Sequence, residues 1–151
     1  MIFKGSNALR VPLTVIGLVA ALGAVATTPA AARSASCWGG PTVTIPNGRT
    51  YSTSVCPTWV QTRVRELPAR NGDTTGYLFP GNNWVVCQRK GDENDQLGGG
   101  RNDIWLYTQG DTTEHEYNGW GWIPATSVSY GGDYEPIPGV RWCTGTDPRW
   151  P

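Results

Sequence analysis

The single histidine, His115, lies between Glu114 and Glu116, and such a run could transfer protons in an acid–base mechanism. A catalytic triad also needs a nucleophile beside the base and a carboxylate that orients it. No Gly-x-Ser-x-Gly motif or other nucleophile signature occurs in the chain. Two of the twelve acidic residues could still form a carboxylate pair that cleaves a glycosidic bond. We therefore interpret His115 as a surface loop residue and expect no enzyme, with a cell-wall hydrolase as the remaining catalytic alternative.

Four acidic residues near a glycine-rich stretch could supply the oxygen ligands of a calcium site. They are Asp92, Glu93, Asp95 and Asp103. A Ca²⁺ loop places its oxygen ligands at alternate positions, and this rhythm is absent here. We interpret the stretch as a solvated loop and expect neither a metal ion nor a cofactor.

Eight tryptophans are many for a chain of this size, and several gather in short β-rich runs joined by glycine-containing turns. The runs are 83–87, 104–107 and 119–124. A thin core holds only a few rings, whereas an exposed indole offers a flat face for a sugar or a proline and one oriented N–H donor. In extended strands Trp105 shares a face with Tyr107, and Trp120 shares one with Trp122. The rings predict either a ligand groove or a packed core, and we take Trp105, Tyr107 and Trp120 as ligand-binding candidates.

Residues 1–32 predict an export signal. Lys4 and Arg10 precede an apolar run, and Ala30-Ala31-Ala32 supplies the small residues that signal peptidase requires. The apolar run of about 15 residues is shorter than the ~20 that a membrane-spanning helix needs. Lipidation at Cys37 is disfavoured, because the preceding Ser34-Ala35-Ser36 lacks the usual aliphatic residue. We expect a secreted, extracellular protein without a membrane anchor.

The chain that remains after residue 32 has ten basic and twelve acidic residues, a formal net charge of about −2. This balance gives no electrostatic signature for nucleic acid or anionic lipid, so neither is expected as a partner. The length suits one domain, and we expect a monomer.

The four cysteines could bind zinc or form disulfides. Zinc is disfavoured, because no Cys-x-x-Cys pair occurs and there is only one histidine. An even number of cysteines in an exported domain favours two disulfides, for which three connectivities are open. We expect Cys37–Cys56, which would staple an N-terminal hairpin, and Cys87–Cys143, which would tie the later strands to the C-terminal tail.

Turn and strand signals predict an all-β fold. In the segment 33–62, two β-rich runs flank Asn47-Gly48, which predicts an accessory hairpin. Residues 59–66 fit a strand, because flanking prolines leave a stretch too short for a stable helix. The Pro80-Gly81 pair predicts a turn between two further strands. No apolar pattern of helical period follows the export signal, so a barrel or a small sandwich is expected.

Three stretches carry a resemblance to a known family. They are GYLFPGNNWVVCQ at 76–88, WLY at 105–107 after a variable loop, and GWIPA at 121–125. In these, the chain resembles bacterial Src homology 3-like (SH3b-type) domains, most closely the secreted, cysteine-containing single-domain proteins of Gram-positive bacteria. The resemblance spans residues 63–130 and leaves 131–151 as a Pro/Gly-rich C-terminal tail. One departure is Pro68, which replaces a residue that would donate to a sheet ladder.

The resemblance implies a small, partly open, five-stranded barrel whose role is ligand attachment. Bacterial members bind peptidoglycan peptides, and eukaryotic ones bind Pro-rich peptides. In the eukaryotic type the groove is lined by the aromatic residue after the variable loop and by the proline of a tight turn, which match Trp105 and Pro124.

We therefore expect a secreted, non-catalytic binding module for a cell-wall peptide or glycan, with Trp105, Tyr107, Trp120 and Pro124 as the ligand-binding candidates. The alternative is a protein-interaction or protease-inhibitor-like domain that binds another secreted protein. It would present the loop closed by the Cys37–Cys56 staple, since a rigid loop loses little entropy on binding.

Overall fold

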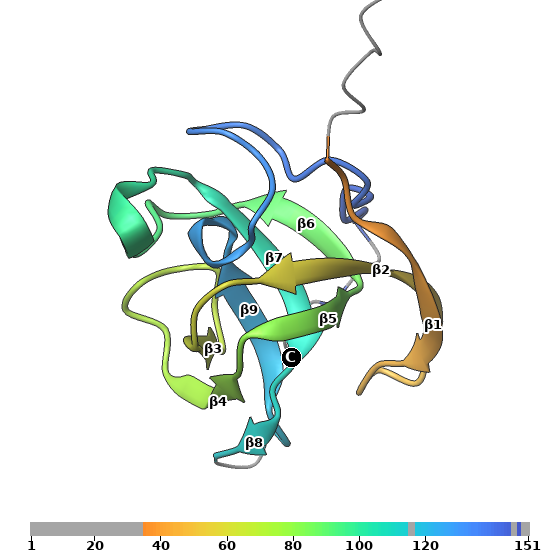
Figure 1. Ribbon diagram of the computed structural model, residues 1–151. Coiled ribbons are helices and arrows are strands. Elements are labelled where there is room, and N and C mark those ends of the chain that lie inside the picture. The colour runs from red at the N-terminus through yellow and green to blue at the C-terminus, as the bar shows by residue number, and fades with distance from the viewer. Residues whose placement is uncertain (1–34, 115–116, 146–147, 149–151) are drawn as a thin grey trace, which may run out of the picture. The chain divides into compact units, whose positions relative to one another are not determined.

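Two antiparallel sheets make up the fold (Figure 1). The computed structural model describes residues 35–114, 117–145 and 148. Within these residues, one sheet has the strand order β1-β2-β5 and the other has the order β6-β7-β9-β3-β4-β8. The strands are β1 (Trp38–Thr44), β2 (Thr50–Thr58), β3 (Thr62–Arg65), β4 (Thr74–Leu78), β5 (Gly81–Val85), β6 (Cys87–Lys90), β7 (Ile104–Gln109), β8 (Thr112–Thr113) and β9 (Trp120–Pro124). Two short 3₁₀ turns, η1 (Leu97–Gly99) and η2 (Ala125–Ser127), are the only helical elements in the described part of the chain. The all-β prediction is confirmed.

Strands β1 and β2 form the hairpin expected in residues 33–62. In its turn, the Arg49 N–H donates to Asn47 Oδ1 at 2.9 Å, and Gly48 adopts a φ of +80°, which glycine reaches without strain. The hairpin is part of a larger sheet, because β2 also pairs with β5 along its second half.

Two prolines lie where strands end. Pro80 separates β4, which pairs with β3 and β8, from β5, which pairs with β2, so the chain passes from one sheet to the other at this turn. Pro68 lies in the turn after β3. Its missing N–H therefore removes no ladder bond.

Two clusters of buried side chains fill the interior. One is mainly aliphatic and the other mainly aromatic. Strand β7 contributes to both, because successive side chains of a strand point to opposite faces. Ile104 and Leu106 enter the aliphatic cluster, whereas Trp105 and Tyr107 enter the aromatic one.

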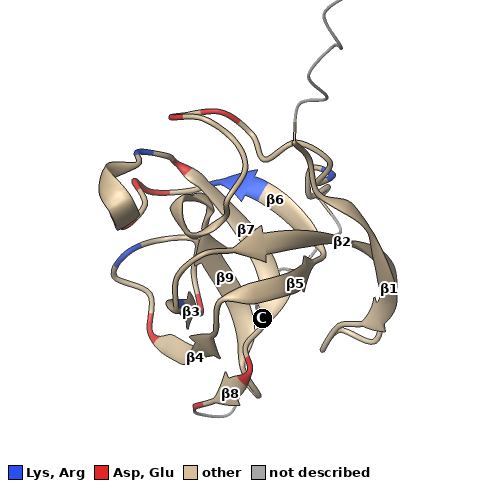
Figure 2. Ribbon diagram, viewed as in Figure 1, with Lys and Arg blue, Asp and Glu red and all other residues tan. Residues whose placement is uncertain are grey.

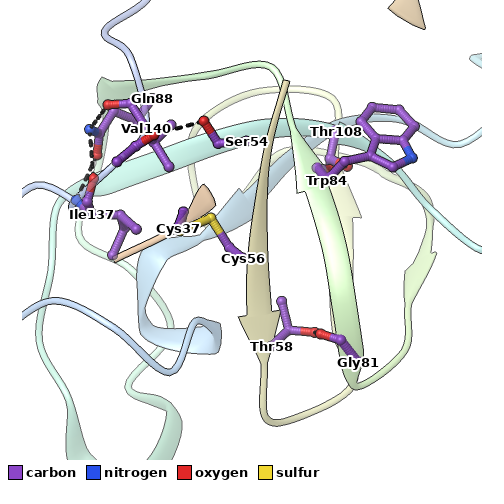
Figure 3. Close-up of a disulfide and its surroundings, with 11 residues drawn as sticks. Cys37, Ser54, Cys56, Thr58, Gly81, Trp84, Gln88, Thr108, Ile137 and Val140 are labelled. Carbon is purple, nitrogen blue, oxygen red and sulfur yellow. Dashed lines mark hydrogen bonds between the residues drawn. A yellow bond between two sulfur atoms is a disulfide. The ribbon is translucent and has the colours of Figure 1, made fainter. Parts of the chain in front are cut away.

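Part of the expected C-terminal tail belongs to the core. Ile137 and Val140 are buried in the aliphatic cluster. The buried Gln88 side chain holds this segment (Figure 3): its Nε2 donates to Ile137 O at 3.1 Å and to Val140 O at 2.7 Å, and its Oε1 accepts from Ile137 N at 2.8 Å. These bonds satisfy polar groups that would be costly to bury unpaired.

The two disulfides join Cys37 to Cys56 and Cys87 to Cys143, the pairs expected from the sequence. The first disulfide connects Cys37, just before β1, to Cys56 on β2 (Figure 3). Cys37 N also donates to Pro138 O at 2.9 Å. The second connects Cys87 at the start of β6 to Cys143, which follows Ile137 and Val140 in the chain. The two disulfides therefore fasten the segment before β1 and the segment after Val140 to the sheets.

Candidate functional site

The four residues expected to line a ligand groove are buried. The exposed fraction is 0% for Trp105, 2% for Tyr107 and 7% for Trp120, and Pro124 is buried as well. Strand β7 is paired on one side with β6 and on the other with β9, and both of its faces are covered by core clusters. The expectation of an open groove at these residues is therefore corrected: Trp105, Tyr107 and Trp120 pack in the aromatic cluster, and Pro124 is buried at the end of β9.

Contacts within the fold hold these rings in place. Trp105 Nε1 donates to Asp92 O at 2.7 Å, which satisfies the indole donor. The rings of Tyr107 and Trp120 stack with centroids 5.6 Å apart. Burial raises the pKa of the Tyr107 phenol well above its ordinary value, so this group stays neutral.

Other aromatic residues are exposed. Their exposed fractions are 45% for Trp38, 47% for Trp59, 43% for Phe79, 51% for Tyr134 and 46% for Trp142. Trp59 differs from a freely rotating surface ring, because its Nε1 donates to Thr126 O at 2.9 Å. Its main-chain N–H also donates to Ser127 O at 3.1 Å. Trp59 is thus a fixed aromatic side chain with almost half of its surface open to solvent.

Trp59 lines a groove of about 260 Å³, which we call the Trp59 groove. The groove is bounded by the loop that contains η1, by η2 and the residue after it, and by the start of the C-terminal segment. The lining residues besides Trp59 are Leu97, Gly98, Gly100, Arg101, Asn102, Ala125, Thr126, Val128, Tyr130, Gly131, Gly132 and Asp133. Two segments that are far apart in the sequence, 97–102 and 125–133, therefore meet at the Trp59 side chain.

One wall of the Trp59 groove is supported from the core. The Thr126 hydroxyl donates to Asp95 O at 2.7 Å, and the Asp95 carboxylate pairs with the buried Arg65 guanidinium at 2.9 Å. Gly98 lies so close to the Trp59 ring that an added Cβ would stand 3.0 Å from the indole, and its φ is +61°. Glycine is needed there both for space and for conformation.

The opposite wall is fixed by hydrogen bonds to the C-terminal segment. Arg101 N donates to Asp133 Oδ1 at 2.9 Å, and Tyr134 N donates to Arg101 O at 3.0 Å. Asn102 Nδ2 donates to Gly132 O at 3.2 Å. The groove carries one cationic and one anionic side chain, Arg101 and Asp133, beside a fixed ring. This combination suits a ligand with polar groups along an apolar face, such as a saccharide or a peptide.

The carboxylates near the glycine loop make contacts within the protein. Asp95 pairs with Arg65, Asp103 pairs with Lys90 at 3.2 Å, and Glu93 accepts from the Tyr134 hydroxyl at 2.9 Å. This bond is the main cause of the raised pKa of Tyr134. No group of three or more His, Cys, Asp or Glu side chains that could hold a metal ion occurs in the described ranges. His115 and Glu116 lie outside the described residues, as does the predicted export signal.

Comparisons with models of protein families, with curated proteins and with solved structures gave no match. In the described part of the chain, no helix is long and apolar enough to span a membrane. The two disulfides are consistent with an extracellular protein, since disulfides persist in oxidising environments.

Trp59 was not among the ligand-binding residues expected from the sequence. The sequence holds one weak indication of its exposure: Trp59 lies close after Pro57, between two β-rich runs. A side chain between strands need not follow the alternation of buried and exposed positions that a strand imposes. The fixation of Trp59 by Thr126 is not visible in the sequence.

Proposed function

We propose that this protein is a secreted, non-catalytic binding module that holds a cell-envelope peptide or glycan in the Trp59 groove. The observation that carries the proposal is the state of Trp59, which is 47% exposed and yet anchored to Thr126 O. A ring that is already fixed loses little conformational entropy when a sugar or a proline stacks on it. The proposal keeps the ligand class expected from the sequence and moves its site from Trp105 and Pro124 to Trp59.

The finer fold is proposed to be a small, partly open SH3-like barrel. In support, β6, β7 and β9 form an antiparallel meander, η2 follows immediately, and Val128 then bridges back to Thr58 at the end of β2. Strand β5 pairs with β2, and β6 follows β5 directly with only Val86 between them. In this assignment the five barrel strands are β2, β5 with β6, β7, β9 and the short segment at Val128, so the N-terminal hairpin supplies a barrel strand.

The second candidate function is a protein-interaction domain that presents the disulfide-closed loop. Ile45, just before the β1–β2 turn, is 3% exposed and packs in the aromatic cluster, and Cys37 and Cys56 are buried. The turn itself, residues 46–49, is exposed and is the surface that such a domain would present to a partner.

The test is co-sedimentation of the secreted protein with purified peptidoglycan, followed by titration with soluble peptidoglycan fragments. Trp59→Ala should reduce binding at least about tenfold, because loss of a stacked aromatic ring costs about 1.4 kcal/mol or more. Trp38→Ala is the matched control, since Trp38 is exposed to nearly the same fraction, 45%, on the edge strand β1. Equal binding by both variants and the unmodified protein would refute the Trp59 groove as the site. Release of reducing sugar or peptide would instead support the hydrolase.

A further inference from the structure

A second hollow, of about 400 Å³, lies beside the Cys87–Cys143 disulfide and shares no lining residue with the Trp59 groove. Strand β6 forms one wall, and the segment that begins at Trp142 forms the other. The lining residues are Arg89, Lys90, Trp142, Cys143, Thr144, Gly145 and Pro148. We call this hollow the Trp142 pocket.

The two walls are held together along their length. Gln88 N donates to Arg141 O at 2.9 Å, and Cys143 N donates to Gln88 O at 2.9 Å, so residues 141–143 run beside β6 as a parallel bridge. The disulfide joins the same two segments covalently. The position of Trp142 relative to β6 is therefore set before any ligand arrives.

The described lining of the Trp142 pocket carries two cations and no carboxylate. Figure 2 shows these basic residues at the end of β6. Arg89 and Lys90 are both exposed, and among the described residues no carboxylate lies within 4.0 Å of the Arg89 guanidinium. Lys90 pairs with Asp103 at 3.2 Å, but its side chain remains 69% exposed. The Arg89 guanidinium also lies over the Trp122 ring, 5.6 Å from its centroid. The described lining residues thus carry a net positive charge, on a chain with a small excess of acidic residues after residue 32. Asp147, between Gly145 and Pro148, lies outside the described residues.

Trp142 adds an aromatic surface, because 46% of it is exposed. An indole face packs against the C–H face of a sugar ring, and a guanidinium binds a carboxylate or a phosphate through two parallel N–H groups. We propose that the Trp142 pocket is a second ligand site, and that it binds a saccharide bearing acidic groups. Carboxylates and phosphates are both anions whose oxygens accept hydrogen bonds, so either group suits the two cations.

The test is isothermal titration of the secreted, disulfide-intact protein with three matched oligosaccharides and a peptide. The probes are an oligogalacturonate, which carries carboxylates, a phosphorylated oligosaccharide, a neutral chito-oligosaccharide and an oligoglutamate peptide. At least one acidic saccharide should bind about tenfold or more tightly than the neutral one, and binding should weaken as salt rises. Tighter binding of the oligogalacturonate would identify the carboxylate as the recognised group, and tighter binding of the phosphorylated oligosaccharide would identify the phosphate.

Variants locate the site and separate this proposal from the previous one. Arg89→Gln and Trp142→Ala should each weaken binding of the acidic saccharide about tenfold, since each removes a charge-assisted or stacking contact. Arg63→Gln, an exposed arginine on β3, and Trp38→Ala, an exposed tryptophan on β1, should leave it unchanged. Circular dichroism spectra of all four should match the parent. The proposal is overturned if neutral and acidic saccharides bind alike, if oligoglutamate binds as tightly as the saccharides, or if Arg89→Gln and Trp142→Ala bind normally. Loss of peptidoglycan binding in Trp59→Ala alone bears only on the Trp59 groove.

Discussion

Trp59 and Thr126, separated by 67 positions in the sequence, are joined by a hydrogen bond of 2.9 Å from the indole Nε1 to the Thr126 carbonyl oxygen. The carbonyl belongs to η2, which directly follows the central-sheet strand β9. The bond therefore ties the exposed ring to a turn that is continuous with the six-stranded sheet. It also turns the ring's only donor inward, so the exposed part of the ring offers an apolar surface to a ligand.

The first prediction isolates this hydrogen bond. Trp59→Phe keeps an aromatic face but loses the donor, so the ring becomes freer and must be ordered on binding. With a net hydrogen-bond contribution of about 1 kcal/mol, affinity for soluble peptidoglycan fragments should fall about fivefold, less than in Trp59→Ala. Isothermal titration of the two variants measures the difference. Equal affinities for the Phe variant and the unmodified protein would show that orientation of the ring contributes nothing.

The second prediction concerns the buried Arg65–Asp95 pair behind the groove. The Arg65 side chain is 8% exposed, whereas that of Asp95 is 34% exposed and can be rehydrated when its partner is lost. Asp95→Asn, which strands the buried cation, should lower the free energy of unfolding by about 3 kcal/mol. Arg65→Met should cost less, about 1–2 kcal/mol, because the remaining carboxylate reaches water.

Urea unfolding followed by fluorescence tests this order. Lys90→Met is the control, since it breaks an exposed ion pair and should change stability by less than about 1 kcal/mol. A larger loss in Arg65→Met than in Asp95→Asn would mean that Asp95 is less solvated than its exposure indicates.

The third prediction concerns Gln88, whose side chain makes three hydrogen bonds to the C-terminal segment. Gln88→Met preserves much of the volume but leaves two carbonyls and one N–H without these partners. Stability should fall by about 3 kcal/mol, and the Ile137 amide should exchange faster with solvent. Gln61→Met, at an exposed position, should be neutral within about 0.5 kcal/mol. Unchanged exchange at Ile137 would indicate that the two disulfides alone hold the segment.

The fourth prediction concerns alkaline pH. Burial raises the pKa of Tyr107 above the unfolded value of about 10, so the unfolded chain releases this proton first as pH rises. The contribution of Tyr107 is fully present below pH 10 and is lost above it, at ~1.4 kcal/mol per pH unit while the folded group stays neutral. Tyr107→Phe should remove this slope. Urea unfolding between pH 8 and 11 compares the two proteins, and parallel curves would contradict the assignment.

Local signals in the sequence were sufficient for the hairpin. Asn47-Gly48 favours a tight turn whatever surrounds it, and a hairpin brings its two ends together. Cys37 and Cys56 lie at those ends, so the turn favoured this pairing among three open connectivities. Only the tertiary structure decided the connectivity, because Cys87 and Cys143 come together through contacts between segments distant in the sequence.

The candidate groove could not be located in the same way. Strand β7 reads IWLYTQ, and such a run is compatible with a groove wall or with a strand covered on both faces. In the structure β7 lies in the interior, because it pairs with both β6 and β9. The C-terminal segment, which returns to Gln88 on β6, covers it further.

By itself, the sequence determined the all-β class and the main turns, because these depend on backbone preferences and on neighbours nearby in the chain. Only the tertiary structure decided which aromatic rings face solvent. Exposure depends on segments brought together from distant positions, as Trp59 is by Thr126 and Trp142 is by β6. The same residue type therefore packs the core at position 105 and forms an open, anchored surface at position 59.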